Sequence, residues 1–336
     1  MSTSLAVPVF LAAAVVSLGM SWLLVSSLER VGERLGLSEA LLGIVAALAA
    51  DAPEITAAIT ALVHHEPRVG AGVVIGSNVF NLAALLGLGA VLAGRIALHR
   101  RVILLGGVVA LAVAAVCLAA VLGLVSALAG LLITVVVLGL YLFVLGEGPR
   151  RLKRLPLPRR WGAWLSSAVR EEELELVVAI RPQRGRPRDA AVATGSLLLV
   201  VGASVAMERA AVTLGNRWGV PPLVVGGLVL AAITSLPNAV AANYLAAKGR
   251  GAATLSTALT SNNLNVVVGL LLPATIVGLQ PPSGRTTLVA AWYVGLTAVV
   301  LGWAYRDHSL RRVAGLVVIV AYLVFVGVLL KTTGAV

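Results

Sequence analysis

The chain has 336 residues, of which 59% are hydrophobic and 12% are charged, with a formal net charge of +12. Because a soluble domain carries roughly a quarter charged residues, this composition excludes an ordinary soluble globular protein and indicates a polytopic helical membrane protein. The single cysteine, Cys117, allows neither a disulfide framework nor a thiolate metal cluster within the chain.

Apolar runs bounded by charged residues and Gly/Pro clusters predict about ten membrane-spanning helices, since each crossing needs about 20 mostly apolar residues. In chain order the runs lie near residues 5–26, 38–63, 69–93, 102–123, 126–146, 190–211, 220–247, 252–279, 286–304 and 312–331. The long hydrophilic segment at residues 147–189 is expected to be a loop with a short interfacial helix around Trp161 and Trp164. Residues 1–146 and 190–336 then form two halves of five spans each.

The positive charges are distributed unevenly along this predicted topology. If residues 147–189 are cytoplasmic and the spans alternate, most Lys and Arg residues face the cytoplasm. The opposite side then holds Arg68, Arg209, Arg217, Arg285 and Lys331. This bias follows the positive-inside rule, so the sequence predicts an integral membrane protein with a cytoplasmic loop and both termini outside. Contact with the lipid bilayer then explains the net charge, without nucleic acid as a partner.

The two halves contain an internal repeat at an offset of 184 residues. A proline and a Ser-Asn-x-x-Asn string coincide without a gap, together with several small and apolar residues. The aligned pairs are Gly43 and Gly227, Val45 and Val229, Ala47 and Ala231, Pro53 and Pro237, Ala57 and Ala241, Ser77 and Ser261, Asn78 and Asn262, and Asn81 and Asn265. Because each half has an odd number of spans, the second copy is inverted in the membrane, as in alternating-access transporters. The binding site is therefore expected at mid-membrane, where the copies meet.

Polar residues interrupt two consecutive apolar spans in each copy. Pro53 and Pro237 are expected to break their helices and free backbone carbonyl groups, which lipid tolerates only where the backbone is buried or lines a cavity. Carboxylate, amide and hydroxyl oxygens surround these breaks, and such oxygens suit a hard cation. The candidate ion-binding residues are Asp51, Glu54, Ser77, Asn78, Asn81, Thr234, Ser235, Asn238, Asn262 and Asn265, with Asp51, Glu54 and Asn81 expected to bind the transported metal cation.

Each of these residue types also has a structural explanation. Pro53 and Pro237 can be packing kinks, the serines can be small-residue contacts, and the asparagines can join neighbouring helices by hydrogen bonds. Asp51 and Glu54 favour a functional explanation, because an ionisable side chain within the membrane costs several kcal/mol. Their spacing also places both carboxylates on one face of a helix.

At these residues the sequence resembles the calcium/cation antiporter superfamily, the membrane region of sodium/calcium exchangers. That family has two inverted alpha repeats, with Gly-Thr-Ser-x-Pro-Glu/Asp in the second and seventh spans and Gly-Ser-Asn-x-x-Asn/Asp in the third and eighth. The corresponding strings here are Ala50-Asp51-Ala52-Pro53-Glu54, Gly76-Ser77-Asn78-Val79-Phe80-Asn81, Thr234-Ser235-Leu236-Pro237-Asn238 and Thr260-Ser261-Asn262-Asn263-Leu264-Asn265. The resemblance covers residues 38–93 and 220–279 and implies the prokaryotic ten-span fold, with discontinuous helices at mid-membrane.

The resemblance also implies roles for individual residues. Glu54 matches the first-repeat carboxylate that binds the transported ion, and Asn81 matches its amide partner in the third span. Thr234 and Ser235 match the hydroxyl groups of the second repeat. Four positions depart from the family pattern, because Asn238 and Asn265 replace carboxylates while Ala50 and Asp51 replace Thr and Ser. The acidic charge is thus moved to one repeat, which indicates an altered ion site.

The expected function is secondary active cation antiport by alternating access, with Ca2+ or another cation exchanged for Na+ or H+. These inorganic cations are substrates, and no cofactor is expected. One divalent ion, or two monovalent ions or protons, would neutralise the two central carboxylates, so near-electroneutral exchange is expected. Removal of the carboxylates from water and their mutual repulsion make proton coupling physically reasonable. Na+ coupling is the other possibility.

Two alternatives are a monovalent Na+/H+ exchanger and a transport-inactive homologue that acts as a sensor or assembly partner. An intramembrane enzyme is disfavoured, because no nucleophile has an evident base and the histidines lie at predicted interfaces; they are His64, His65, His99 and His308. By analogy with the family, the location is the cytoplasmic membrane of a prokaryote. The sequence gives no oligomeric state.

Overall fold

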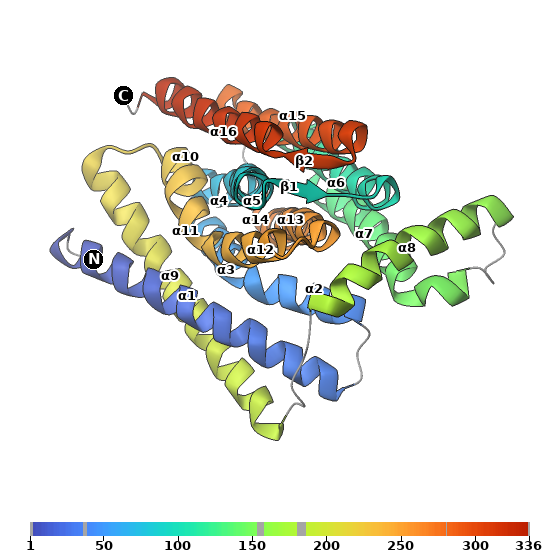
Figure 1. The fold of residues 1–336 in the computed structure, drawn as a ribbon. Coiled ribbons are helices and arrows are strands. Elements are labelled where there is room, and N and C mark those ends of the chain that lie inside the picture. Colours follow the sequence, from blue (N-terminus) through green and yellow to red (C-terminus); the bar gives the residue numbers. More distant parts are fainter. Residues whose placement is uncertain (1–2, 36–38, 153–157, 180–185, 280, 335–336) are drawn as a thin grey trace.

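The computed structural model describes residues 3–35, 39–152, 158–179, 186–279 and 281–334, and these residues are helical apart from turns and one small sheet. Figure 1 shows the arrangement. The first half comprises α1 (Thr3–Arg34), α2 (Glu39–Ala50), α3 (Ala52–Val63), α4 (Pro67–Asn81), the π-helix η1 (Leu82–Gly87), α5 (Leu88–Ala93), β1 (Arg95–Ala97), α6 (Arg100–Val121) and α7 (Ala127–Leu152). Then follows α8 (Arg159–Ala179).

The second half begins with a helix that pairs with α1 and ends with a helix near the C-terminus (Figure 1). Its elements are α9 (Pro187–Trp218), α10 (Pro222–Val224), η2 (Val225–Leu230), α11 (Ala231–Thr234), α12 (Leu236–Ala247), α13 (Gly251–Leu264), η3 (Asn265–Leu271), α14 (Leu272–Val277), α15 (Gly284–Asp307), β2 (Ser309–Arg311) and α16 (Arg312–Thr333).

The apolar runs of the sequence form the long helices. Among the described residues, eight helical stretches are long and apolar enough to cross a membrane. A ninth candidate is the bent pair Pro222–Thr234 and Leu236–Ala247, whose axes differ by 48°. The predicted span at 38–63 is divided into α2 and α3, each of 12 residues, with Asp51 between them. The helices thus correspond to the ten predicted spans, although α7 and α9 extend into the predicted loop.

Two glycine contacts bring the repeats together at α4 and η2. A Cβ atom at Gly76 would lie 2.3 Å from the carbonyl oxygen of Gly227, and one at Gly226 would lie 2.2 Å from the carbonyl oxygen of Val69. Both distances are far shorter than van der Waals contact, so only glycine, which has no Cβ, permits this spacing. The close approach places Ser77, which follows Gly76, at the boundary between the repeats.

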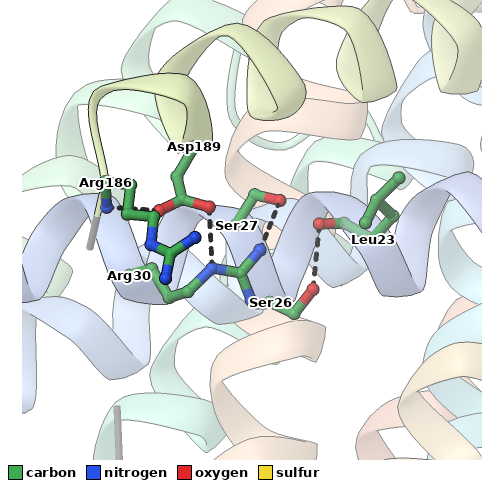
Figure 2. Close-up of polar contacts among 6 residues, drawn as sticks. All are labelled: Leu23, Ser26, Ser27, Arg30, Arg186 and Asp189. Atoms are coloured by element: carbon green, nitrogen blue, oxygen red, sulfur yellow. Dashed lines mark hydrogen bonds and ion pairs between the residues drawn. The ribbon is translucent and has the colours of Figure 1, made fainter. Parts of the chain in front are cut away.

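Helices α1 and α9 form an antiparallel pair on one flank of the molecule (Figure 1). Midway along the pair, the hydroxyl oxygens of Ser17 and Ser204 lie 3.3 Å apart. Near one end, Arg30 Nε donates to Asp189 Oδ1 at 2.9 Å (Figure 2). The other oxygen of Asp189 accepts the backbone N–H of Arg186 at 2.5 Å, which caps the start of α9. Side-chain bonds therefore join the two helices at separate levels.

Two features of the fold have no counterpart in the predicted elements. The π-helices η1 and η3 occupy matching positions in the two repeats, directly after Asn81 and from Asn265 onward. Strands β1 and β2 pair antiparallel, with Ile96 opposite Leu310, and connect the segments before α6 and α16. The predicted helix around Trp161 is present as α8, and Arg101 Nη1 donates to Glu171 Oε1 of α8 at 2.8 Å.

Candidate ion site

The two predicted carboxylates lie in the interior, where α2 gives way to α3. Asp51 is the residue before α3, and Glu54 is in its first turn. Both residues are 0% exposed. Because they are separated by three positions, they project from one helical face, as the sequence predicts. The first repeat thus carries two acidic groups into a region without solvent contact.

Asp51 is held by side chains of the second repeat. Asn238 Nδ2 and Ser261 Oγ each donate to Asp51 Oδ1 at 2.6 Å. Asn238 lies near the start of α12, and Ser261 lies in α13. The two donors are neutral, so they orient the carboxylate without balancing its charge.

Glu54 has an equivalent environment. The hydroxyl group of Ser235 donates to Glu54 Oε1, and Asn265 Nδ2 donates to Oε2 at 2.6 Å. Ser235 lies between α11 and α12, and Asn265 begins η3. Both donors are again neutral and again come from the second repeat, so the two halves of the chain meet at the carboxylates.

These contacts follow the internal repeat. At the 184-residue offset, Asp51 corresponds to Ser235 and Glu54 corresponds to Asn238. The bond from Ser235 to Glu54 is therefore the counterpart of the bond from Asn238 to Asp51, with donor and acceptor exchanged between the copies. The helix junctions of the two repeats face each other across a pseudo-twofold axis.

A second set of contacts joins α4 to α13. Asn81 Nδ2 donates to Ser261 Oγ and to Asn262 Oδ1, both at 3.1 Å. Asn265 Nδ2 also donates to Asn78 Oδ1 at 3.2 Å. The asparagines thus form a continuous network with the carboxylates, and some of their hydrogen bonds connect helices, as the structural explanation expects.

Several buried oxygens in this network have no hydrogen-bond partner among the described residues. They are Asp51 Oδ2, Ser77 Oγ, Asn81 Oδ1 and Asn265 Oδ1. Buried polar atoms in folded proteins almost always have a partner, so four such oxygens in one cluster need an explanation. Carboxylate, amide and hydroxyl oxygens are all ligands of hard cations, so each of these oxygens is a candidate ligand of a bound cation.

The negative charge of Asp51 and Glu54 also favours cation binding. The four bonds to Asp51 and Glu54 come from hydroxyl and amide groups. A buried carboxylate without a compensating positive charge is costly, because hydrogen bonds from neutral groups recover only part of its hydration. A cation that binds between the repeats would supply the missing charge.

The remaining predicted residues are Thr234 and the two prolines. The Thr234 hydroxyl donates to the carbonyl oxygen of Leu230 at 2.9 Å, within its own helical segment, and not to a carboxylate. Pro53 and Pro237 lie in the first turns of α3 and α12. A proline is well tolerated at that position because the first N–H groups of a helix have no partner within it. The prolines therefore stand where new helices begin.

One buried acidic residue lies outside the predicted site. Glu208 of α9 is 1% exposed, and its Oε2 atom has no hydrogen-bond partner among the described residues. An acidic residue within an apolar run is a functional signal in its own right, and that signal could have identified Glu208 from the sequence.

Comparisons with known proteins identify the family. A model of the sodium/calcium exchanger protein family matches residues 5–146 and 190–331. Sodium/potassium/calcium exchanger 1 of Bos taurus is 29% identical over 139 residues, which are 39% of this chain and 11% of that protein. The protein of the same name from Homo sapiens is 27% identical over 154 residues, which are 44% of this chain and 14% of that protein. The matches thus span only a small part of these curated relatives.

Solved structures show the same fold. The H+/Ca2+ exchanger CAX has a TM-score of 0.69 at 16% identity, over 95% of this chain and 81% of that chain. The sodium-calcium exchanger NCX_Mj has a TM-score of 0.61 at 18% identity, over 97% of this chain and 99% of that chain. These likenesses confirm the predicted all-α membrane fold with two repeats. Because the family model matches most of both halves, the chain belongs to the sodium/calcium exchanger protein family.

Proposed function

We propose that the protein is a secondary active antiporter that carries Ca2+, or a related divalent cation, in exchange for Na+ or H+. The observation that supports this most strongly is the buried pair of Asp51 and Glu54, which accepts hydrogen bonds from neutral donors and belongs to a region with several buried oxygens that have no hydrogen-bond partner among the described residues. CAX is an H+/Ca2+ exchanger and NCX_Mj is a sodium-calcium exchanger. Proteins with this fold therefore include one that exchanges Ca2+ for H+ and one that exchanges Ca2+ for Na+.

The proposed ligands of the transported cation are Asp51, Glu54 and Asn81, together with Ser77 and Asn265. The side-chain amides of Asn81 and Asn265 suit this role because in each the nitrogen donates hydrogen bonds while the oxygen is left for the cation. Asn265 Nδ2 donates to Glu54 Oε2 at 2.6 Å, and Asn81 Nδ2 donates to Ser261 Oγ of the second repeat. Among the residues that the structure describes, the Oδ1 atoms of both asparagines have no hydrogen-bond partner. A cation can therefore bind the free oxygens without disturbing the bonds that position the carboxylates.

The charge of the site sets the expected exchange ratio. Asp51 and Glu54 together carry two negative charges when both are ionised. One divalent cation, or two monovalent cations, neutralises them, and the same pair serves both ions in turn. The cycle then exchanges one Ca2+ for two Na+ or two H+ and moves no net charge across the membrane.

Alternating access needs a conformation in which the site is closed to both sides, and a group of helices that moves. The complete burial of Asp51 and Glu54 fits the closed conformation. The pair α1 and α9 fits the moving group, because its two helices are joined by Ser17 with Ser204 and by Arg30 with Asp189. We propose that this pair moves as a unit against the helices that carry the ion site.

The proposed orientation follows from the positive charges of the sequence. Residues 147–189 are placed in the cytoplasm, and both termini are placed outside the cytoplasmic membrane of a prokaryotic cell. In this orientation the Arg30 end of α1 faces the cytoplasm and the turn between α3 and α4 faces outward.

The test is ion flux in proteoliposomes that contain the purified protein. Ca2+ uptake is measured under an outward Na+ gradient and, separately, under an outward H+ gradient. Uptake driven by one gradient, with counter-movement of that ion, supports the proposal and names the coupling ion. Na+/H+ exchange without Ca2+ movement indicates the monovalent alternative. Folded protein that moves none of these ions contradicts antiport of them and favours the transport-inactive alternative.

A further inference from the structure

The turn between α3 and α4 lies against α9, and three polar side chains meet there. His64 ends α3, and Glu208 and Arg209 belong to α9. His64 Nδ1 lies 3.7 Å from Glu208 Oε2, and Arg209 Nη2 lies 3.0 Å from His64 Nε2. The central carboxylates are distant from this cluster, since Glu54 is ten positions earlier on α3, or about 15 Å along the helix.

A cavity of about 620 Å³ opens at this cluster. Its polar lining comprises His64, Glu66, Glu208, Arg209 and Thr213. Of the described residues that line it, the charged or titratable ones are therefore on α9 and in the α3–α4 turn, whereas α1 contributes Val9. Glu208 is almost fully buried, and its Oε2 atom has no hydrogen-bond partner within the described part of the chain.

The contact with Arg209 defines the hydrogen-bonding role of one His64 nitrogen. An arginine side chain has only donors and keeps its charge in proteins, so Nε2 of His64 is the acceptor of the 3.0 Å bond. Nδ1 is then the ring nitrogen on the side of Glu208. At 3.7 Å, Nδ1 is too far from Glu208 Oε2 for a hydrogen bond, although the distance is within that of an ion pair.

A proton added to this cluster has two places to bind, and both change the contacts of α9. On Glu208 it removes a buried negative charge. On His64 it converts Nε2 into a donor, which cannot accept from Arg209, and it places a positive charge between the Arg209 guanidinium and the Glu208 carboxylate, whose Oε2 atom lies 3.7 Å from Nδ1.

We propose that Glu208 and His64 form a second proton-binding site, separate from the central carboxylates, and that its protonation changes the contacts between α9 and the α3–α4 turn. The link to transport rests on the proposed function, because it assumes that α9 moves during exchange. The proton site itself does not depend on that assumption. Its ligand is H+ from the solution on the face that carries His64.

The proton site is tested in protein from which the two central carboxylates have been removed, so that they do not contribute to the spectra. Acid–base infrared difference spectra are recorded for the full chain with Asp51→Asn and Glu54→Gln, with and without Glu208→Gln. The expected result is a carboxyl C=O band that appears on acidification and is lost in the Glu208→Gln protein. Identical spectra with and without this substitution would overturn the proposal. A Glu171→Gln substitution, in α8, is the matched control and should leave that band in place.

The link to transport is tested by flux at about pH 6 and about pH 8 on the face that carries His64. His64→Gln is the informative variant, because Gln can still accept from Arg209 but cannot be protonated. Acidification should change wild-type flux about fivefold relative to His64→Gln and Glu208→Gln, the effect expected from one altered contact. Equal pH profiles for the three proteins would overturn the link. Absence of flux in the wild type would contradict the proposed function, whereas the infrared result would still decide the proton site.

Discussion

Asn78 and Asn262 are equivalent residues of the two repeats, and each donates its side-chain amide to the backbone carbonyl oxygen of the other, at 3.1 and 3.2 Å. This reciprocal pair lies on the pseudo-twofold axis and is buried, with exposed fractions of 0% and 1%. It joins α4 to α13 beside the carboxylates. The internal repeat therefore appears in the order of the helices and also in direct hydrogen bonds between equivalent residues.

The first prediction concerns the stability of this junction. Asn78→Ala and Asn262→Ala should each lower the free energy of unfolding by about 0.5–1.5 kcal/mol, because each removes a buried hydrogen bond between the repeats while the carbonyl oxygen keeps its main-chain donor. The double variant should cost less than the sum, since both residues belong to one network. Denaturant unfolding in detergent measures these values, and Asn216→Ala, at an exposed position of α9, is the control. If the loss of unfolding free energy in the double variant equals the sum of the two single losses, Asn78 and Asn262 are not energetically coupled and the prediction is wrong.

The second prediction concerns the contact between α4 and η2. Gly76→Ala should destabilise the protein by about 1–3 kcal/mol or more and reduce transport, because the new Cβ would lie 2.3 Å from the Gly227 carbonyl oxygen. Gly302→Ala in α15 is the matched control, since a Cβ there meets nothing within 4 Å. That substitution should be neutral or stabilise the protein by about 0.5–1 kcal/mol, because Ala favours the helix over Gly. Equal effects of the two substitutions would argue against the close approach.

The third prediction concerns net charge movement. Asn238→Asp adds a carboxylate next to Asp51, where Asn238 Nδ2 lies 2.6 Å from Asp51 Oδ1. A site with three acidic groups should recruit one further monovalent cation per cycle, so exchange should become electrogenic. Currents on a solid-supported membrane measure this, with wild type expected to give none and Asn216→Asp as the surface control. A current in the wild type would refute the electroneutral cycle.

The fourth prediction concerns pH. Asp51 and Glu54 bind a metal cation only when they are deprotonated, so Ca2+ binding releases any protons they carry. The apparent affinity for Ca2+ should therefore fall as pH falls, by up to about tenfold per pH unit for each proton displaced. Titration calorimetry in two buffers with different heats of ionisation measures both the affinity and the protons released. An affinity that stays constant between about pH 6 and about pH 8 would contradict proton competition at the site.

Much of the site could be predicted from local sequence. The motif Asp51-Ala52-Pro53-Glu54 combines acidic residues and a proline within an apolar run, and both features are costly in lipid unless the segment has a special role. The repeat then predicts that the matching segment of the second half lies opposite. The structure brings these segments together, with Asn238 and Ser235 bonded to the two acidic residues.

Other features could not be predicted, because apolar periodicity specifies which residues are buried and not which residues pair. The bond from Ser261 to Asp51 joins residues 210 positions apart, and no local pattern selects it. The π-helices η1 and η3 have the same apolar composition as α-helices, so hydropathy cannot distinguish them. The hydrogen bond of Thr234 could not be predicted either, because donation to the preceding turn is an option that every threonine in a helix has; its role in ion binding stays a prediction.

The most direct test of the central claim is Ca2+ flux in proteoliposomes for wild type and Glu54→Gln, with Glu171→Gln as the control. Glu54 and Gln have nearly the same shape, so the substitution removes the charge at the site while keeping the side chain. The account predicts gradient-driven Ca2+ exchange in the wild type and the control, and loss of flux by about a hundredfold or more in Glu54→Gln, equivalent to roughly 3 kcal/mol of lost cation stabilisation. Undiminished Ca2+ exchange in folded Glu54→Gln protein would contradict the claim that the two buried carboxylates bind the transported ion.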